Sequence, residues 1–324
     1  GGLFAAKALK KAPVQVTIID KTVQHLFQPL LYQVATGILS QGVIAPPTRE
    51  ILNRQRNAEV LLGEVTDVDV EARTVTHRVG EYVTTTPYDS LIVSAGAGQS
   101  YFGHDEFAEF APGLKSIDDA LELRGRIYGA FEIAELLDDP EAAEQWLTFV
   151  VIGAGATGVE VAGQIRELSS RALRHDFRRI NPADAKVILV DAGDQVLASF
   201  GEGLGERSKK ALEKLNIDVR LGHTVTGMDA QTVELTDKDG TKHVIKSNCK
   251  VWAAGVSASS LGRKLGEQTG AAVDRSGRVA TLPDTTLPGH EEVFVIGDMA
   301  SLNDYPGVAQ GAMQGGNYAA GQIK

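Results

Sequence analysis

The sequence has 324 residues, with 32 Lys and Arg against 42 Asp and Glu, and a formal net charge of −10. A chain of this length favours two domains, and without a basic cluster it has no electrostatic footprint for nucleic acid. Its single cysteine, Cys249, excludes an internal disulfide or a metal site of several thiolates, and the thiol is expected only to pack.

The N-terminal segment GGLFAAKAL, residues 1–9, has the composition of an alanine-rich helix that opens on two glycines. An apolar strand is predicted at 14–19, and it ends at Asp20, 18 residues after Gly2. Glycine, helix, strand and acid in this order form the second half of a dinucleotide-binding unit. The first strand and first glycine of that unit are therefore expected to precede Gly1.

Residues 22–48 contain no Asp, Glu, Lys or Arg, and this 27-residue run raises the question of a membrane span. Prolines and glycines interrupt the run, and its glutamines would need partners in lipid, so we do not predict a transmembrane helix. A helix buried in a large core is expected. A surface that lies against a bilayer, or the wall of an apolar pocket, remains an alternative.

Strands and helices are predicted to alternate along the rest of the chain. Short β-rich pieces across 59–86 predict a small meander, and SLIVS at 90–94 predicts a buried strand. Apolar spacing predicts a helix over 116–137 with Ser116 as its N-cap. Strands separated by helices favour an α/β fold with parallel sheets wound on both sides by helices. Further strands are predicted at 148–152, 186–190, 225–236, 243–247, 249–254 and 293–296, with a helix at 158–172.

The segment FVVIGAGATGVEVAG, residues 149–163, is a buried-strand pattern that breaks into a glycine turn and resumes with helical spacing. Gly153 permits a tight turn after the strand, and Gly155 lets the backbone approach a pyrophosphate. Gly158 lets the helix pack closely on the sheet. Free amides and the helix dipole favour an anion at this end. The segment predicts dinucleotide binding, with a glycine turn that only packs as the alternative.

Asp191, at the end of the next apolar strand, is the acid expected to bind the ribose of the dinucleotide. A carboxylate there would also repel a 2′-phosphate and so favour NAD over NADP. It lies 33 residues past Gly158, where about 20 is usual. The segment SSRALRHDFRRINPAD is therefore expected to be an insertion that lengthens the helix or its loop. A solvated strand end is the alternative interpretation of Asp191.

Two dinucleotide-binding units in one chain indicate FAD in one and a nicotinamide nucleotide in the other, because a flavin can accept a hydride and hand on electrons. Six segments carry a resemblance to a known family: HLFQPLLYQVATGILS, SLIVSAGAGQSYFG, GAGATGVEVAGQI, VWAAGVSAS, VFVIGDMA and GVAQGAMQGGNYAA. With them the chain resembles, over essentially its whole length, the type II NADH dehydrogenases, which are single-chain NADH:quinone oxidoreductases. It is most similar to their actinobacterial branch.

The resemblance implies FAD and NADH as cofactors, a quinone as substrate, no metal and no proton pumping. Hydride would pass from NADH to the flavin, and quinone would then collect two electrons and two protons in a ping-pong cycle. The FAD-binding domain is expected over 1–115 and 280–324, with the NAD-binding domain inserted at 116–279 and a small β-meander in each. Expected FAD contacts are Gly2, Asp20, Lys21, Gln28, Val65, Ala95, Gly96, Asp298 and Gln310. Expected NAD contacts are Gly153, Gly155, Thr157, Gly158, Glu160, Asp191, Ala254 and Gly255.

Glu160, Gln310 and Gln314 are the expected catalytic residues. Glu160 is predicted in the first turn of its helix, where the helix dipole stabilises a carboxylate. The alternative is that Glu160 only stabilises the helix in this way and has no catalytic role. The resemblance implies that Glu160 orients the nicotinamide or relays protons towards the quinone. A spacing of four puts Gln310 and Gln314 on one helical face, where they could bind a quinone carbonyl and the flavin ring. The alternative is that these two glutamines only make the N-terminus of their helix polar.

Enzymes of related architecture that reduce disulfides or oxidise sulfide use a pair of cysteines, which Cys249 alone cannot supply. A NADH-dependent ferredoxin-type reductase and an NAD-binding redox sensor remain as alternatives. The resemblance implies peripheral attachment to the cytoplasmic face of the cell membrane through a C-terminal region expected beyond Lys324. It leaves open whether the protein is a homodimer.

Overall fold

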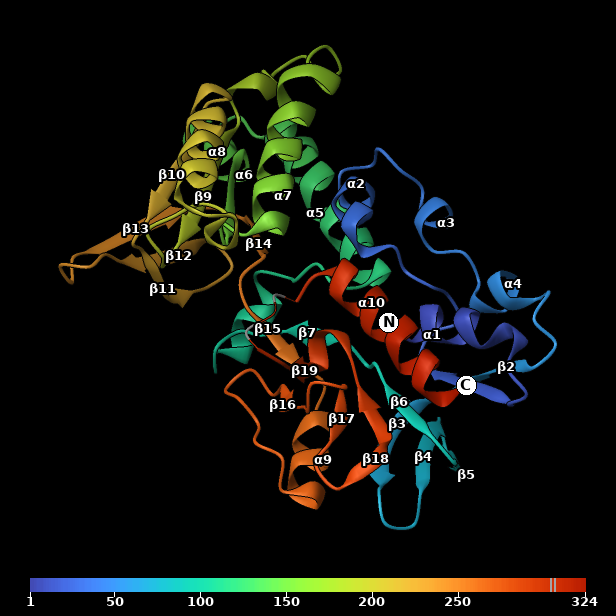
Figure 1. The fold of residues 1–324 in the computed structure, drawn as a ribbon. Coiled ribbons are helices and arrows are strands. Elements are labelled where there is room, and N and C mark those ends of the chain that lie inside the picture. The colour runs from blue at the N-terminus through green and yellow to red at the C-terminus, as the bar shows by residue number, and fades with distance from the viewer. Residues whose placement is uncertain (304, 306) are drawn as a thin grey trace. The chain divides into compact units, whose positions relative to one another are not determined.

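Figure 1 shows the computed structural model, which describes residues 1–303, 305 and 307–324. These residues divide into two compact units. The terminal unit, as we call it, comprises Gly1–His25, Ala45–Gly98 and Val256–Lys324, and the central unit comprises Leu26–Ile44 and Gln99–Gly255.

The units change at 98/99 and 255/256, rather than at the 115/116 and 279/280 suggested by the sequence. The segment after residue 98 packs in the central unit because Trp252 donates from its backbone to Pro112 O (3.0 Å) and from Nε1 to Ser100 O (2.9 Å). The segment after residue 255 packs in the terminal unit, where Gln268 bonds the backbone of both Val68 (2.6 Å) and Val70 (3.0 Å). Tertiary hydrogen bonds of this kind leave no pattern in the sequence.

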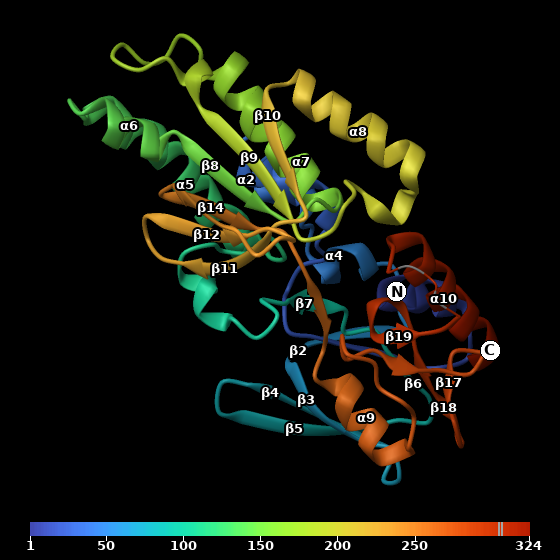
Figure 2. The ribbon, with the colours of Figure 1, turned by 90° about the vertical axis from the view of Figure 1, so that its left-hand side faces the viewer.

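A parallel sheet with strand order β10–β9–β8–β14 forms the centre of the central unit. Helices α7 and α8 pack against β8, β9 and β10, and α5 and α6 pack against β14 and β8 (Figure 2). Val150 and Ile152 of β8 pack with Val233 and Leu235 of an antiparallel sheet, so this inner strand is buried at every residue. The sheet is parallel and flanked by helices as expected, but the face that carries Val150 and Ile152 is covered by an antiparallel sheet and not by helices. The elements are α5 (Ile117–Leu136), α6 (Pro140–Trp146), β8 (Thr148–Ile152), α7 (Ala156–Glu167), β9 (Lys186–Asp191), α8 (Glu202–Lys214), β10 (Ile217–Leu221) and β14 (Cys249–Trp252).

Local sequence signals account for the ends of these helices. Ser116 caps α5 through a capping box, in which its Oγ accepts from Asp119 N (3.1 Å) and Asp119 Oδ2 accepts from Ser116 N (2.8 Å). Helix α7 ends at Glu167 and continues as a π-helical turn, Leu168–Ala172. The predicted insertion therefore lengthens both the helix and the loop that follows it.

An antiparallel sheet, β11–β12–β13, completes the central unit (Figure 1). Leu235 and Ile245 on one face of this sheet join Ile188 and Trp252 in a common core. Cys249 is buried and free, and burial raises the pKa of its thiol to about 12, so it packs as an inert thiol as predicted. The strands are β11 (Thr224–Met228), β12 (Thr232–Thr236) and β13 (Lys242–Lys246).

The charge-free stretch forms several short helices rather than the one buried helix that was expected. Helix α2 buries Leu31 and packs on α5, while Phe27 is 52% and Val43 64% exposed. Gly37, with φ of +76°, and the prolines break the run into pieces. None of the described helices has the length and apolarity of a membrane span. The pieces are η2 (Gln28–Leu30), α2 (Leu31–Ala35) and α3 (Gln41–Ile44), and α4 (Thr48–Leu52) begins where the stretch ends.

The terminal unit contains the parallel pair β1–β2 and the mixed sheet β17–β18–β6, in which β18 runs parallel to β6 and antiparallel to β17. The segment 59–86 was predicted as one meander, but its first strand β2 pairs in parallel with β1, and the antiparallel meander is β3–β4–β5. Helix α1 packs against α10. The main elements are α1 (Gly2–Ala8), β1 (Val16–Asp20), β2 (Ala58–Leu62), β3 (Glu64–Asp69), β4 (Thr74–Val79), β5 (Tyr82–Pro87), β6 (Leu91–Val93), α9 (Leu261–Thr269), β17 (Thr286–Leu287), β18 (His290–Val295) and α10 (Ala309–Ile323). Its short elements are η1 (Leu9–Lys11), β7 (Ala97–Gln99), β15 (Val256–Ala258), β16 (Val279–Ala280), η7 (Gly297–Met299) and β19 (Ala300–Ser301). Those of the central unit are η3 (Asp105–Glu109), η5 (Pro182–Asp184) and η6 (Ala198–Phe200).

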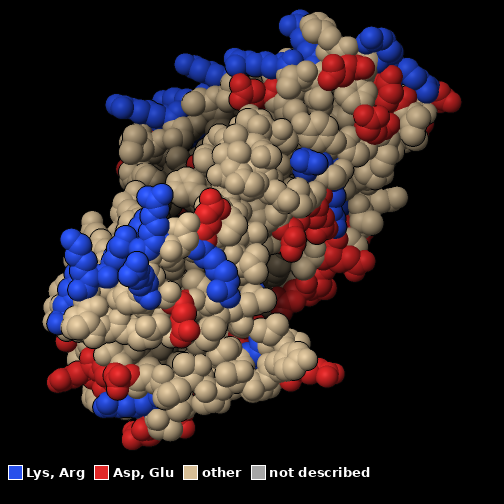
Figure 3. Space-filling view, turned by 90° about the vertical axis from the view of Figure 1, so that its right-hand side faces the viewer, with Lys and Arg blue, Asp and Glu red and all other residues tan. Residues whose placement is uncertain are grey.

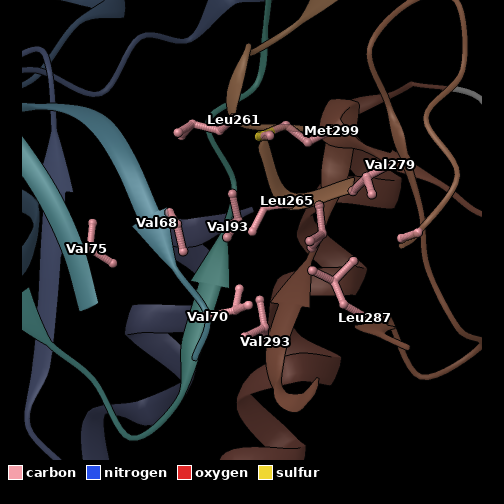
Figure 4. Packing of buried hydrophobic residues seen from close by; sticks show 12 residues of the cluster. Val68, Val70, Val75, Val93, Leu261, Leu265, Val279, Leu287, Val293 and Met299 are labelled. Carbon is pink, nitrogen blue, oxygen red and sulfur yellow. The ribbon is translucent and has the colours of Figure 1, made fainter. Parts of the chain in front are cut away.

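The core of the terminal unit lies where the meander, β6, β18 and α9 meet (Figure 4). Val68, Val93, Leu265 and Val293 point into it and are at most 5% exposed. The core fixes the carboxyl ends of β6 and β18, which carry several predicted site residues.

On the surface, the face in Figure 3 carries Lys and Arg as well as Asp and Glu, with broad uncharged areas between them.

Candidate functional site

The glycine turn of the central unit joins β8 to α7. Gly153 has φ of +108°, and its N–H donates to Val190 O at 2.7 Å. A Cβ added at Gly153 would lie 2.6 Å from Ala254 N, and one added at Gly158 would lie 1.7 Å from Gly153 O. The turn therefore depends on both glycines, because no side chain fits at either position.

Gly155 occupies the N-cap of α7 with an extended backbone and no side-chain cap. A Cβ at this position would meet no atom within 4 Å, so the space in front of the helix end is open. Thr157, in the first turn, is half-buried beside it. Uncapped amides, the positive end of the helix dipole and open space together suit a pyrophosphate, so the residues present fit a dinucleotide.

Asp191 lies at the end of β9, next to the glycine turn. Its Oδ2 accepts from Ala154 N at 2.6 Å and its Oδ1 accepts from Gly193 N at 2.7 Å. The carboxylate therefore stabilises the glycine turn, a role that neither interpretation from the sequence predicted. An ionised carboxylate has further lone pairs, so these two bonds leave acceptor capacity for a ribose hydroxyl.

Ala254 and Gly255 follow β14 and are held by residues that the sequence analysis missed. The side chain of Gln99 donates from Nε2 to Ala254 O and to Gly255 O, the latter at 2.8 Å. Gly255 has φ of +73°, and a Cβ there would lie 2.7 Å from both Ser100 O and the ring of Phe102. The available signal was the segment AGAGQSYFG, in which Gln99 and Phe102 stand beside predicted contacts.

Glu160 is not in the first turn of α7, because the helix begins at Ala156 and Glu160 is its fifth residue. The helix has no acidic residue in its first turn. The predicted stabilisation by the dipole is therefore wrong. Instead, partial burial raises the pKa of the Glu160 carboxyl above its ordinary value. The side chain remains accessible to solvent and so could exchange a proton.

The glycines at the start of the terminal unit are also closely packed. A Cβ at Gly2 would lie 2.5 Å from Ser94 Oγ, at the end of β6. A Cβ at Gly316 in α10 would lie 2.5 Å from Gly1 O. The start of α1 thus lies against the backbone of α10 and against the Ser94 side chain after β6. Close packing of this kind is what the glycines of a nucleotide-binding turn permit.

Asp20 ends β1, as predicted. Its Oδ1 accepts from the backbone N–H of Thr22 (2.8 Å) and from its hydroxyl (2.9 Å). Lys21 is exposed beside it, and Val65 in β3 packs against the core of the unit. The contact of Asp20 is local, within two residues.

Ala95, Gly96 and Asp298 follow the parallel strands β6 and β18, so their backbones gather at one edge of this sheet. Gly96 has φ of +68°, and a Cβ there would meet no atom within 4 Å, so the backbone is open to a ligand. Gln310 and Gln314 lie one turn apart on α10, and both are exposed, which agrees with the predicted shared face. These residues fit a second nucleotide.

Each compact unit thus collects most of the residues predicted for its nucleotide. The expected NAD contacts all lie in the central unit, and the expected FAD contacts lie in the terminal unit except Gln28. Gln28 is exposed in η2 of the central unit. The structure therefore groups it apart from Gly2 and Asp20.

Comparison with known proteins places the chain in a family. The pyridine nucleotide-disulphide oxidoreductase family matches residues 1–316. The type II NADH:quinone oxidoreductase Ndh of Mycobacterium tuberculosis is 57% identical over 324 residues, which are 100% of this chain and 70% of the relative. NdhA of the same organism is 58% identical over 325 residues, covering 100% of this chain and 69% of the relative.

A solved structure supports the fold. The structure of NDH2 from Plasmodium falciparum in complex with NADH matches with a TM-score of 0.83 and 22% identity, over 93% of this chain and 62% of that chain. Likeness at this identity shows the fold alone. The family follows from the full-length matches: the chain belongs to the type II NADH:quinone oxidoreductases, within the pyridine nucleotide-disulphide oxidoreductases.

Proposed function

We propose that this chain oxidises NADH and reduces a quinone by two electrons, with NADH at the glycine turn of the central unit and FAD at that of the terminal unit. The observation that carries the proposal is the turn Gly153–Gly158, open in front of Gly155, in a chain 57% identical over its length to a type II NADH:quinone oxidoreductase. The match of the pyridine nucleotide-disulphide oxidoreductase family to residues 1–316 supports both nucleotides.

The central unit binds NADH by its backbone. The amides at the start of α7, around Gly155 and Thr157, receive the pyrophosphate, and Asp191 accepts from a ribose hydroxyl while it keeps its bonds to the turn. Ala254 and Gly255, held by Gln99, form a second backbone wall of this site. The carboxylate of Asp191 gives NADH an advantage over NADPH because it repels a 2′-phosphate.

The terminal unit binds FAD in the same manner, as the core of a domain made of the first and last parts of the chain. Gly2 brings the start of α1 to the phosphates, Asp20 accepts from the ribose, and Asp298 meets the ribityl-phosphate region. When bound, FAD supplies a group that takes up a hydride and releases two electrons to a second substrate. Further contacts within this unit are proposed at Lys21, Val65, Ala95, Gly96 and Gln310.

Glu160, Gln310 and Gln314 act on the substrates. Glu160 is partly desolvated and its pKa is raised, so its carboxyl holds a proton closer to neutral pH than an ordinary glutamate does. We assign it the positioning of the nicotinamide or the supply of protons to the reduced quinone. The two exposed glutamine amides, one turn apart on α10, donate to a quinone carbonyl and to the flavin ring.

The steady-state rate of NADH oxidation tests the proposal. With a soluble quinone as acceptor the rate should exceed that with a ferredoxin-type protein, and NADPH should be a poorer donor than NADH. Glu160→Gln should lower quinone reduction by at least about 10-fold. Equal rates with NADH and NADPH would remove the role of Asp191, and turnover with the iron–sulfur protein alone would favour the ferredoxin-type reductase instead.

Quinone is a membrane substrate, and we therefore propose that the enzyme works peripherally at the cytoplasmic face of the cell membrane. The quinone named in both mycobacterial relatives supports this location. Sedimentation of the protein with inverted membrane vesicles checks it, and full recovery in the supernatant would contradict it.

A further inference from the structure

His223, Asp237 and His243 form a cluster at one end of the β11–β12–β13 sheet in the central unit. One candidate ligand atom from each residue lies within 4.8 Å of the other two, and all three side chains are half-buried. The proposed redox reaction uses none of them. Two imidazoles and a carboxylate are a ligand set that binds transition metals in proteins.

The register of the sheet brings the three side chains together. Leu235 pairs with both Val225 and His243. His223 stands two residues before Val225, and Asp237 stands two residues after Leu235. Because side chains two residues apart on a strand point to the same face, all three cluster members share the face that carries Leu235. That face belongs to the apolar core, and the cluster lies at its rim.

One hydrogen bond already orients the ring of His223. Its Nδ1 lies 2.8 Å from Leu221 O. A carbonyl only accepts, so Nδ1 carries the hydrogen and Nε2 of the neutral ring keeps a lone pair. A histidine that ligates a metal commonly donates its other ring N–H to a backbone carbonyl in this way.

Asp237 divides its two carboxylate oxygens between the fold and the cluster. Its Oδ1 accepts from the turn amides of Asp239 (3.0 Å) and Thr241 (2.9 Å). Its Oδ2 lies 3.0 Å from Nε2 of His243. The turn therefore fixes the carboxylate, which presents Oδ2 to the cluster.

We propose that His223, Asp237 and His243 bind a divalent transition-metal ion, with zinc as the ion that best suits this ligand set. Zinc would take the place of the hydrogen between His243 and Asp237, and water would fill a fourth position. Zinc–ligand bonds of about 2.0–2.2 Å put tetrahedral ligand atoms roughly 3.4 Å apart, so atoms within 4.8 Å need only small movements. His243 is 41% exposed, which gives the ion a path of entry.

The site is joined by backbone to the loop that carries Asp191. The N–H of His223 donates to Asp191 O (3.0 Å), and the N–H of Gly222 donates to Gly193 O (2.8 Å). A metal that ties His223 to the β12–β13 hairpin therefore fixes this loop as well. Zinc should accordingly slow amide hydrogen exchange at 221–224 and 237–243, and this effect requires no bound nucleotide.

Equilibrium dialysis of the purified, tag-free protein against Zn²⁺ tests the proposal, with the bound metal measured by atomic emission. One zinc per chain is expected. His223→Gln and His243→Gln should each weaken binding at least about 10-fold with an unchanged far-UV circular dichroism spectrum. Co²⁺ in place of zinc should give visible absorption typical of a four-coordinate site in the wild type only.

His104→Gln is the matched control, because His104 lies 3.1 Å from the carboxylate of Glu106 in an exposed pair without a second histidine. It should leave zinc binding unchanged. The proposal is overturned if the wild type binds no stoichiometric zinc. It is also overturned if the two cluster variants bind zinc as the wild type does, or if His104→Gln loses zinc to the same extent.

Discussion

The two glycine-opened helices of this chain use their acids differently. In the central unit, Asp191 accepts from the amides of Ala154 and Gly193, so it ties the end of β9 to the glycine turn. In the terminal unit, Asp20 accepts from Thr22, two residues away, and ties only the turn that follows β1. The same residue type at the same place in the unit therefore carries a tertiary contact in one case and a local contact in the other.

This difference teaches that the acid of the central unit supports the shape of its own binding turn. Loss of Asp191 should disturb the turn before any ligand binds, whereas loss of Asp20 should act mainly on the ligand. The comparison can be tested from the turn outward, first at the glycines, then at the sheet behind them, and then at the acids.

The largest effect is expected from Gly158→Ala. The new methyl would lie 1.7 Å from Gly153 O, a backbone atom, so the helix and the turn must separate. We expect a loss of about 3 kcal/mol or more in the free energy of unfolding, measured by urea denaturation.

Gly155→Ala is its matched control. A methyl at Gly155 meets no protein atom within 4 Å, so stability should change by less than about 0.5 kcal/mol. The methyl would instead occupy the space proposed for the pyrophosphate, and NADH affinity should fall at least about 10-fold. Equal stability losses in the two variants would contradict the geometry of the turn.

Because of Lys250, which lies in strand β14 next to β8, we expect the stability of the central unit to depend on pH. Its Nζ donates to the carbonyls of Ala230 (2.9 Å) and Ser247 (2.7 Å), and burial lowers its pKa from 10.5 to about 8. Between these values the unfolded chain binds the proton more tightly, so the free energy of unfolding should rise with pH by up to about 3 kcal/mol.

Lys250→Met removes this rise, and the difference between the two stability curves isolates it. The subtraction is needed because Cys249 acts in the opposite sense. Its pKa is raised from 9.0 to about 12, so the folded state binds the proton more tightly and stability falls with pH over that range. Parallel curves for wild type and Lys250→Met would rule out a buried charged lysine.

Asp191→Asn and Asp20→Asn test the opening comparison directly. An asparagine at 191 offers one oxygen to two amides, so one N–H loses its acceptor and stability should fall by about 1–3 kcal/mol. An asparagine at 20 keeps an oxygen for Thr22, and the expected loss is below about 1 kcal/mol. Thermal unfolding of both ligand-free variants checks the ranking, and a greater loss at position 20 would reverse our conclusion.

The smallest effect on stability is expected from Glu160→Gln. Burial raises the pKa of this carboxyl, so the folded state binds its proton more tightly than the unfolded chain and stability falls as pH rises above the ordinary glutamate range. The neutral amide avoids this loss. The variant should be at least as stable as the wild type at pH 7 by thermal unfolding, and a clear loss would mean that the carboxylate makes a stabilising contact.

Much of the α/β fold could be predicted because its signals are local. The strand 148–152, the Gly153–Gly158 turn and the Ser116 cap each depend on a few neighbouring residues, and the structure has them where they were predicted. Glu160 was misplaced because the helix begins at Ala156, two residues before the glycine from which its position was counted.

The remaining features depend on contacts between distant residues. Strand β2 reads as part of a meander, but its partner β1 lies across a long connection. Gln99 stands beside predicted contacts, but the sequence could not pair it with Gly255, because 156 residues separate them. The cluster of His223, Asp237 and His243 likewise arises from strand register, which the sequence does not display.

The most direct test of the account is anaerobic mixing of the purified protein, with FAD bound, first with NADH and then with a quinone, followed by the flavin absorption. We expect NADH to bleach the flavin colour and the quinone to restore it in a second, separate step. A protein that takes up no FAD, or a flavin whose colour NADH does not change, would contradict the proposal that these two glycine turns bind the partners of one electron transfer.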